Sequence, residues 1–168
     1  YEGTGSNATF GHGLGVTPAM VLVKNIDASQ NWFMYHQGIG ATQLLRLNST
    51  SAKISSSTSW NNTAPTSSVV SIGTEAGTNQ NGSTHVAYCF AEKKGYSKFG
   101  TYVGNGNADG TFIYLGFKPA FIMVKSSTST TEWHVSDSSR RPANPNNSYI
   151  SASSSAAENT SNPTDFLS

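Results

Sequence analysis

The segment most suggestive of chemistry is 105–110, which reads Asn-Gly-Asn-Ala-Asp-Gly. Its alternating side-chain oxygens and closing glycine imitate the start of a calcium-binding loop of the EF-hand type. Such a loop ends in a bidentate Glu at its twelfth position, where this chain has Gly116. We therefore predict a tight turn around Asp109 and Gly110 in place of a metal site.

The histidines lack the spacing of a metal site or of a catalytic group. The four histidines are scattered along the chain, and none belongs to a His-x-x-x-His pair. His134, Ser136 and Asp137 have the residue types of a catalytic triad, but they are neighbours on one predicted strand or turn, where side chains alternate between faces. We predict no catalytic residue, no bound metal and no cofactor.

Aromatic side chains are the remaining candidates for a binding site. Trp60, Tyr96 and Tyr149 carry rings that can stack on sugars, and the many Asn side chains can bind hydroxyl groups. The same rings can instead fill the core and the edges of a β-sandwich. A glycan contact at these three residues is thus one of two open interpretations.

The composition favours strands and turns over helices. Ser, Thr and Asn supply more than a third of the residues, and their side chains compete with a helix by bonding to their own backbone. Only 11% of the residues are charged and the formal net charge is +1, which predicts no nucleic-acid partner. No run of 18 apolar residues occurs, so we predict no membrane insertion. The single cysteine, Cys89, lies in an apolar run and is predicted to be a core residue.

The chain repeats itself at an offset of 101 residues. Ten residues recur without a gap between 1–32 and 102–133. Their first copies are Tyr1, Gly3, Gly5, Leu14, Gly15, Pro18, Ala19, Val23, Lys24 and Trp32. We predict a first unit at 1–100 and a second, partial unit at 101–168, packed against the first or completed by another chain. Because the chain opens inside this pattern, we expect it to be a segment of a longer polypeptide.

Apolar runs bounded by Gly, Asn and Ser predict strands along both units. The leading strands are 18–24 and its copy 119–125, which we expect to be covered on both faces because they are unbroken apolar runs. Further strands are expected at 32–36, 44–48, 69–72, 85–92 and 96–103. The predicted fold class is all-β, with tandem antiparallel β-sandwich units of a jelly-roll-like kind.

The second unit has no counterpart of residues 69–99. After Trp133 it continues with small insertions, which place Tyr149 and Ile150 near the positions of Leu45 to Leu47, and Phe166 near that of Trp60. An incomplete sandwich leaves a sheet edge unpaired and apolar surface exposed. We expect the missing strands to come from a neighbouring chain, from the packed first unit, or from sequence that is not present here.

Several blocks follow one another in a characteristic order. They read Gly-Leu-Gly-Val-Thr-Pro-Ala-Met at 13–20, Val-Lys-Asn at 23–25, Ala-Tyr-Cys-Phe-Ala-Glu at 87–92 and Gly-Tyr-Ser-Lys-Phe-Gly at 95–100. Together with Trp32 they resemble the repeat of tail-fibre-like structural proteins in tailed-phage particles, over nearly the whole chain. The resemblance implies a place in the virion and a role in assembly, and it implies no catalytic or ligand residues.

The leading expectation is a non-enzymatic virion module, such as a tail fibre, a spike or a head-decoration protein that attaches to a surface or a host. Its expected partners are other copies of itself in a homo-oligomer, neighbouring virion proteins and a host surface glycan. The runner-up is a carbohydrate-binding module of a secreted or virion-associated protein, which needs two coplanar exposed rings on one face. A hydrolase is a third reading, and it needs two of the nine acidic residues in one cleft.

Overall fold

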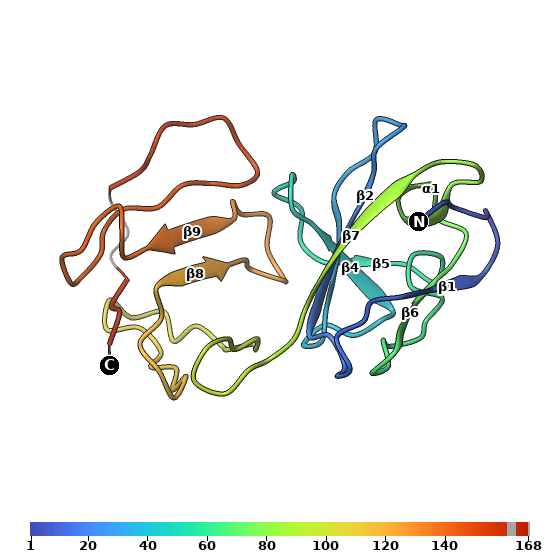
Figure 1. Cartoon of the computed structure of the whole chain (residues 1–168). Coiled ribbons are helices and arrows are strands. Elements are labelled where there is room, and N and C mark those ends of the chain that lie inside the picture. Colours follow the sequence, from blue (N-terminus) through green and yellow to red (C-terminus); the bar gives the residue numbers. More distant parts are fainter. Residues whose placement is uncertain (161–163, 168) are drawn as a thin grey trace.

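The computed structural model describes residues 1–160 and 164–167, and it is an all-β protein with antiparallel sheets (Figure 1). The strands are β1 (Ala8–Gly11), β2 (Met20–Asn25), β3 (Phe33–His36), β4 (Gln43–Arg46), β5 (Ile54–Ser55), β6 (Val69–Ile72), β7 (His85–Phe90), β8 (Phe121–Val124) and β9 (His134–Asp137). The helix α1 (Ala76–Asn79) lies between β6 and β7. Within the described ranges, no helix is long and apolar enough to cross a bilayer. The predicted fold class is confirmed.

Two sheets pack face to face in the first unit. One has five strands in the order β5-β4-β3-β2-β7, and the other pairs β1 with β6. The side chains between them form a core that lies around Trp60, whose indole meets the Tyr35 ring edge-on at 6.0 Å between centroids. On β2 the alternate residues Val21 and Val23 face this core, as expected for the period of two along a strand. The other face of the five-stranded sheet carries Met20, Met34 and Leu45.

The repeat is present in three dimensions. In the first unit Met20 pairs with His36 across β2 and β3, and in the second Phe121 pairs with Asp137 across β8 and β9. All four residue pairs of the two hairpins correspond at the offset of 101. The β-bridge between Val135 and Ile150 repeats the pairing of β3 with β4. Both hairpins therefore have one register, which is the register that the sequence identities predict.

One aromatic side chain of the second unit, Trp133, is buried against the first unit. The Trp133 indole is buried among Met20, Met34 and Leu45 on the outer face of the five-stranded sheet. Its Nε1–H donates to the Arg46 carbonyl at 2.9 Å. Figure 1 shows the β8–β9 hairpin lying beside the larger first unit. Residues more than 80 positions apart thus share one cluster.

Two strand predictions are wrong in part. The segment 96–103 is not a strand, because its first residues belong to a turn around Gly95, at φ +75°, which is closed by the bridge between Lys93 and Ser97. The strand predicted at 119–125 exists, but it is not covered on both faces. Phe121 is 60% exposed, whereas its counterpart Met20 is 7% exposed. The apolar run at 119–125 predicts the strand correctly. It does not indicate whether other strands cover the faces of this strand.

The difference between the two units lies in the partners of their leading strands. β2 pairs with β3 on one side and with β7 on the other, but in the described part of the chain β8 pairs with β9 alone. The counterpart of β1, at 109–112, forms no strand. One edge of β8 is consequently open.

Candidate functional site

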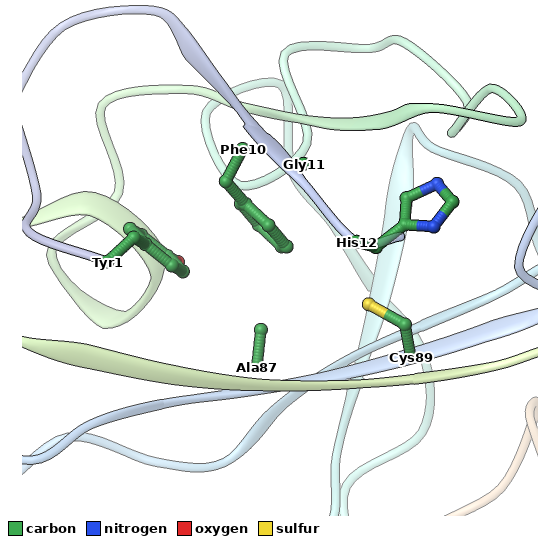
Figure 2. Close-up of a pocket in the computed structure, with 6 residues that line it drawn as sticks. All are labelled: Tyr1, Phe10, Gly11, His12, Ala87 and Cys89. Atoms are coloured by element: carbon green, nitrogen blue, oxygen red, sulfur yellow. The ribbon is translucent and has the colours of Figure 1, made fainter. Parts of the chain in front are cut away.

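A pocket of about 300 Å³ opens between β1 and β7, where the two sheets of the first unit separate (Figure 2). It is lined by Tyr1, Phe10, Gly11, His12, Ala87 and Cys89. Figure 2 shows Phe10 from β1 on one side and Ala87 and Cys89 from β7 on the other. Ala87 and Cys89 face the pocket together because alternate residues of a strand point to one side.

Tyr1 closes one end of this pocket and is held firmly. Its ring stacks on Phe10 at 4.5 Å and on His85 at 5.1 Å between centroids. Its hydroxyl donates to the Thr78 carbonyl at 2.5 Å. Burial raises the pKa of the Tyr1 hydroxyl, and the neighbouring Cys89 raises it further. Tyr1 therefore stays protonated and serves to fill space between the sheets.

The polar groups of the pocket are not prepared for acid–base chemistry. The Leu14 N–H donates to His12 Nδ1 at 3.2 Å, so the proton of a neutral ring lies on Nε2, which meets the Thr66 carbonyl at 3.1 Å. Burial raises the pKa of the Cys89 thiol, which disfavours the thiolate. The lining is suited to holding a small apolar group.

The triad suggested by residue types has other partners. The Ser136 hydroxyl donates to the Ser148 carbonyl at 3.1 Å. Asp137 accepts from the Arg140 guanidinium, and this hydrogen bond lowers the pKa of the Asp137 carboxyl. The His134 ring stacks on Tyr149 at 4.2 Å between centroids. The three groups thus stabilise the second unit locally.

The loop at 105–110 folds on itself. The Asn105 amide donates to the Asp109 carbonyl at 2.8 Å, and the Asn105 and Asn107 side-chain oxygens accept backbone N–H groups of the same loop. These oxygens are therefore used in turn formation. In the described ranges, no group of three or more His, Cys, Asp or Glu side chains could hold a metal ion.

The three predicted glycan-contact residues lie in different surroundings. Trp60 has 0% exposure at the centre of the first core, so its indole cannot reach a sugar in this fold. Tyr149 is half-buried in its stack with His134. Tyr96 is 81% exposed on the turn after β7 and is available to a ligand. Aromatic residue types alone could not separate these three positions, because burial depends on the strands that pack around each ring.

The larger exposed surface belongs to the second unit, and residue-by-residue prediction missed it. Its exposed apolar or aromatic side chains include Tyr102, Val103, Phe112, Ile113, Tyr114 and Phe121. Tyr102 is the counterpart of Tyr1, which contacts His85 and Thr78 in the first unit. At the offset of 101, the counterparts of both partners would fall past position 168. The repeat at an offset of 101 residues is the sequence feature that could have located this surface, because it identifies Tyr102 as the counterpart of Tyr1.

Comparison with known proteins gives one family. A family model described as a domain of unknown function, DUF7483, matches residues 1–168. No curated protein and no solved structure matches the chain.

Proposed function

The chain belongs to the DUF7483 family, and from that premise and the geometry above we propose that it is a non-enzymatic structural module of a phage particle. The module works in assembly and in attachment to a surface or a host. Its partners are other copies of itself, neighbouring virion proteins and a host surface glycan. It is located in the extracellular particle.

The observation that carries this proposal is the exposed apolar surface of the second unit. Phe112, Tyr114 and Phe121 present large apolar side chains to solvent. Large exposed apolar patches mark sites of protein–protein contact, and these three exposed side chains are the basis on which we infer one. The packing of Trp133 on the first unit already shows that one unit can cover a sheet face of another. A module built from such units is suited to assembly.

Two further observations support the proposal. The groups lining the pocket between β1 and β7 favour binding over catalysis, since His12 is engaged at both nitrogens and the pKa of the Cys89 thiol is raised. The order of sequence blocks, from Gly13 to Gly100, resembles that of tail-fibre-like virion proteins. The first observation supports a structural role, and the second supports the phage particle as its place.

The assembly role is tested by light scattering of the 168-residue chain during size-exclusion chromatography. We expect masses above that of the single chain, rising with protein concentration. The triple variant Phe112→Ser, Tyr114→Ser, Phe121→Ser should elute as a monomer with an unchanged far-UV circular dichroism spectrum. Val16→Ser with Ile26→Ser is the matched control, because both side chains are strongly exposed on the first unit. A monomer at all concentrations, or an equal effect of the control, contradicts the role.

The virion location is tested separately. Mass spectrometry of density-purified phage particles whose genome encodes the chain should detect its peptides at a stoichiometry typical of structural proteins. Recovery of the chain only from the particle-free lysate would refute this location without affecting the assembly result.

A further inference from the structure

The turn that follows β7 is held firmly at its base. Lys93 and Ser97 form a β-bridge, in which the Lys93 N–H donates to the Ser97 carbonyl at 3.1 Å and the Ser97 N–H donates to the Lys93 carbonyl at 2.9 Å. The Ser97 hydroxyl donates to the Ala91 carbonyl at 2.9 Å. Gly95, at φ +75°, supplies the left-handed residue that such a tight turn requires. The backbone between the two ends of the bridge is therefore well defined.

One carboxylate ties this turn to the rest of the first unit. Glu92 accepts the Phe99 N–H at 3.1 Å and the Lys98 ammonium at 3.2 Å. The side-chain amide of Gln37, in the loop after β3, also donates to Glu92, at 3.4 Å. The hydrogen bond from the Phe99 N–H is the main cause that lowers the pKa of the Glu92 carboxyl. The charge of Glu92 is thus paired with that of Lys98.

Two lysines of the turn have no such partner. Among the described residues, the ion pairs involve neither Lys93 nor Lys94, and both side chains are exposed. Lys93, Lys94 and Lys98 are three of the ten basic residues of the chain, and no other stretch of six positions contains three. Because Glu92 offsets Lys98 alone, the turn carries an excess of positive charge. Such an excess favours an anionic ligand.

An aromatic ring stands beside these charges. Tyr96 is 81% exposed and lies two positions after Lys94. An exposed aromatic ring can pack against the apolar face of a sugar, while an ammonium group donates charge-assisted hydrogen bonds to a carboxylate or a phosphate. Two free cations on one short turn are too few for a nucleic acid, which is bound by an extended basic surface. The combination is suited to one acidic sugar unit.

We propose that the turn at 93–98 binds an anionic saccharide, with Lys93 and Lys94 on its carboxylate or phosphate group and Tyr96 stacked on its sugar ring. The inference rests on the host-glycan part of the proposed function, and it gives that glycan a chemical class. The turn and the groups that hold it all belong to the first unit. The site is therefore independent of the open edge of β8.

The test is titration calorimetry of the intact 168-residue chain with short oligosaccharides. We expect saturable binding of an oligogalacturonate, which bears carboxylates, or of a phosphorylated oligomannose, and the tighter of the two identifies the anionic group. The methyl ester of the oligogalacturonate keeps the sugar rings and lacks the charge, so it should bind at least about tenfold more weakly. An oligoglutamate with the same number of carboxylates has the charge without the rings and should also bind at least about tenfold more weakly.

Variants of the chain separate the two kinds of contact. Lys93→Gln with Lys94→Gln should weaken binding of the acidic oligosaccharide by about tenfold or more. Lys53→Gln with Lys118→Gln is the matched control, because it removes the same charge at two other exposed positions. Tyr96→Ser should weaken binding by about tenfold, whereas Tyr96→Phe keeps the ring and should bind as the wild type does. The far-UV circular dichroism spectrum should be unchanged in every variant.

The inference is overturned by absence of saturable binding to both oligosaccharides, by equal binding of the methyl ester or the oligoglutamate, or by equal effects of the two double lysine variants. None of these outcomes bears on assembly or on the virion location, which light scattering and mass spectrometry decide separately. Conversely, a monomeric chain, or one that is absent from particles, would refute the proposed function and leave the saccharide measurement unchanged.

Discussion

The indole N–H of Trp133 donates a hydrogen bond to the backbone carbonyl of Arg46, 87 positions earlier in the chain, at 2.9 Å. The ring itself is buried among Met20, Met34 and Leu45. One side chain thus supplies both a directional bond and a buried apolar contact between the two units. Its first-unit counterpart Trp32 has a different environment, since it is half-buried and lies beside Tyr88 at 6.2 Å between centroids.

Trp133→Ala should therefore destabilise the protein strongly. Removing a buried Trp leaves a cavity and an unpaired carbonyl, and the expected loss in the free energy of unfolding is about 3–5 kcal/mol. Urea denaturation followed by circular dichroism measures it. The matched variant Trp32→Ala should cost about 1 kcal/mol, because its ring is already partly solvated. Equal losses in the two variants would show that the contact between the units contributes little.

The sequence predicted the strands and their register well, and the reason is physical. Apolar runs such as 18–24 and 69–72 have the residue types that fit a pleated, covered surface, and β2 and β6 lie there. Ten identities at one offset predicted equivalent hairpins, and β2–β3 and β8–β9 share a register. Two short elements were missed, β5 with two residues and α1 with four, because neither is long enough to show a period.

What could not be predicted depends on packing between distant segments. The burial of Trp60 requires both sheets of the first unit, and Phe121 is 60% exposed whereas its counterpart Met20 packs against Trp133. The residue types at these two positions are similarly apolar, so composition ranks them alike. The pocket between β1 and β7 is lined by residues about 75 positions apart, and no local sequence motif predicts it.

Asn79 is a second position where the fold depends on one buried side chain. Its amide donates to the Ser6 and Gly73 carbonyls, both at 2.6 Å, and its oxygen accepts the Thr4 N–H at 2.7 Å. Asn79→Ala leaves these groups without their partner, and we expect a loss of about 2–4 kcal/mol in the free energy of unfolding. Urea denaturation is again the measurement. Asn81→Ala, at an exposed position, should change stability by no more than about 0.5 kcal/mol, and a comparable loss there would contradict this role of Asn79.

Stability should fall as the pH drops from 7.5 to 5.5. Burial lowers the pKa of His36, whose Nδ1 also accepts the Gly38 N–H at 3.1 Å, and burial lowers the pKa of His134. The folded state thus disfavours the imidazolium, so the unfolded chain binds more protons below its ordinary pKa of about 6.5. This contribution is fully present above that pH and is lost on acidification. The urea midpoint at the two pH values measures the effect.

The variant His36→Gln should reduce this pH dependence, and the double variant with His134→Gln should reduce it further. Hydrogen bonds lower the pKa of the Asp27, Glu92 and Asp137 carboxyls, so their contribution is lost only in the more acidic range. A wild-type midpoint that stays constant between pH 5.5 and 7.5 would exclude the histidine contribution.

Gly77 on α1 should not tolerate a side chain. A Cβ there would overlap the Phe33 ring, which is buried in the first core. In an ordinary helix Gly→Ala stabilises by up to about 1 kcal/mol, because alanine restricts the unfolded chain. Here we expect Gly77→Ala to lower the free energy of unfolding by about 1–3 kcal/mol, since the packed ring has no space to move into. Gly100→Ala is the control, because its Cβ would meet nothing within 4 Å. Thermal denaturation of both variants measures the loss of stability. A Gly77→Ala variant as stable as the wild type would mean that α1 moves away from β3 with no loss in the free energy of unfolding.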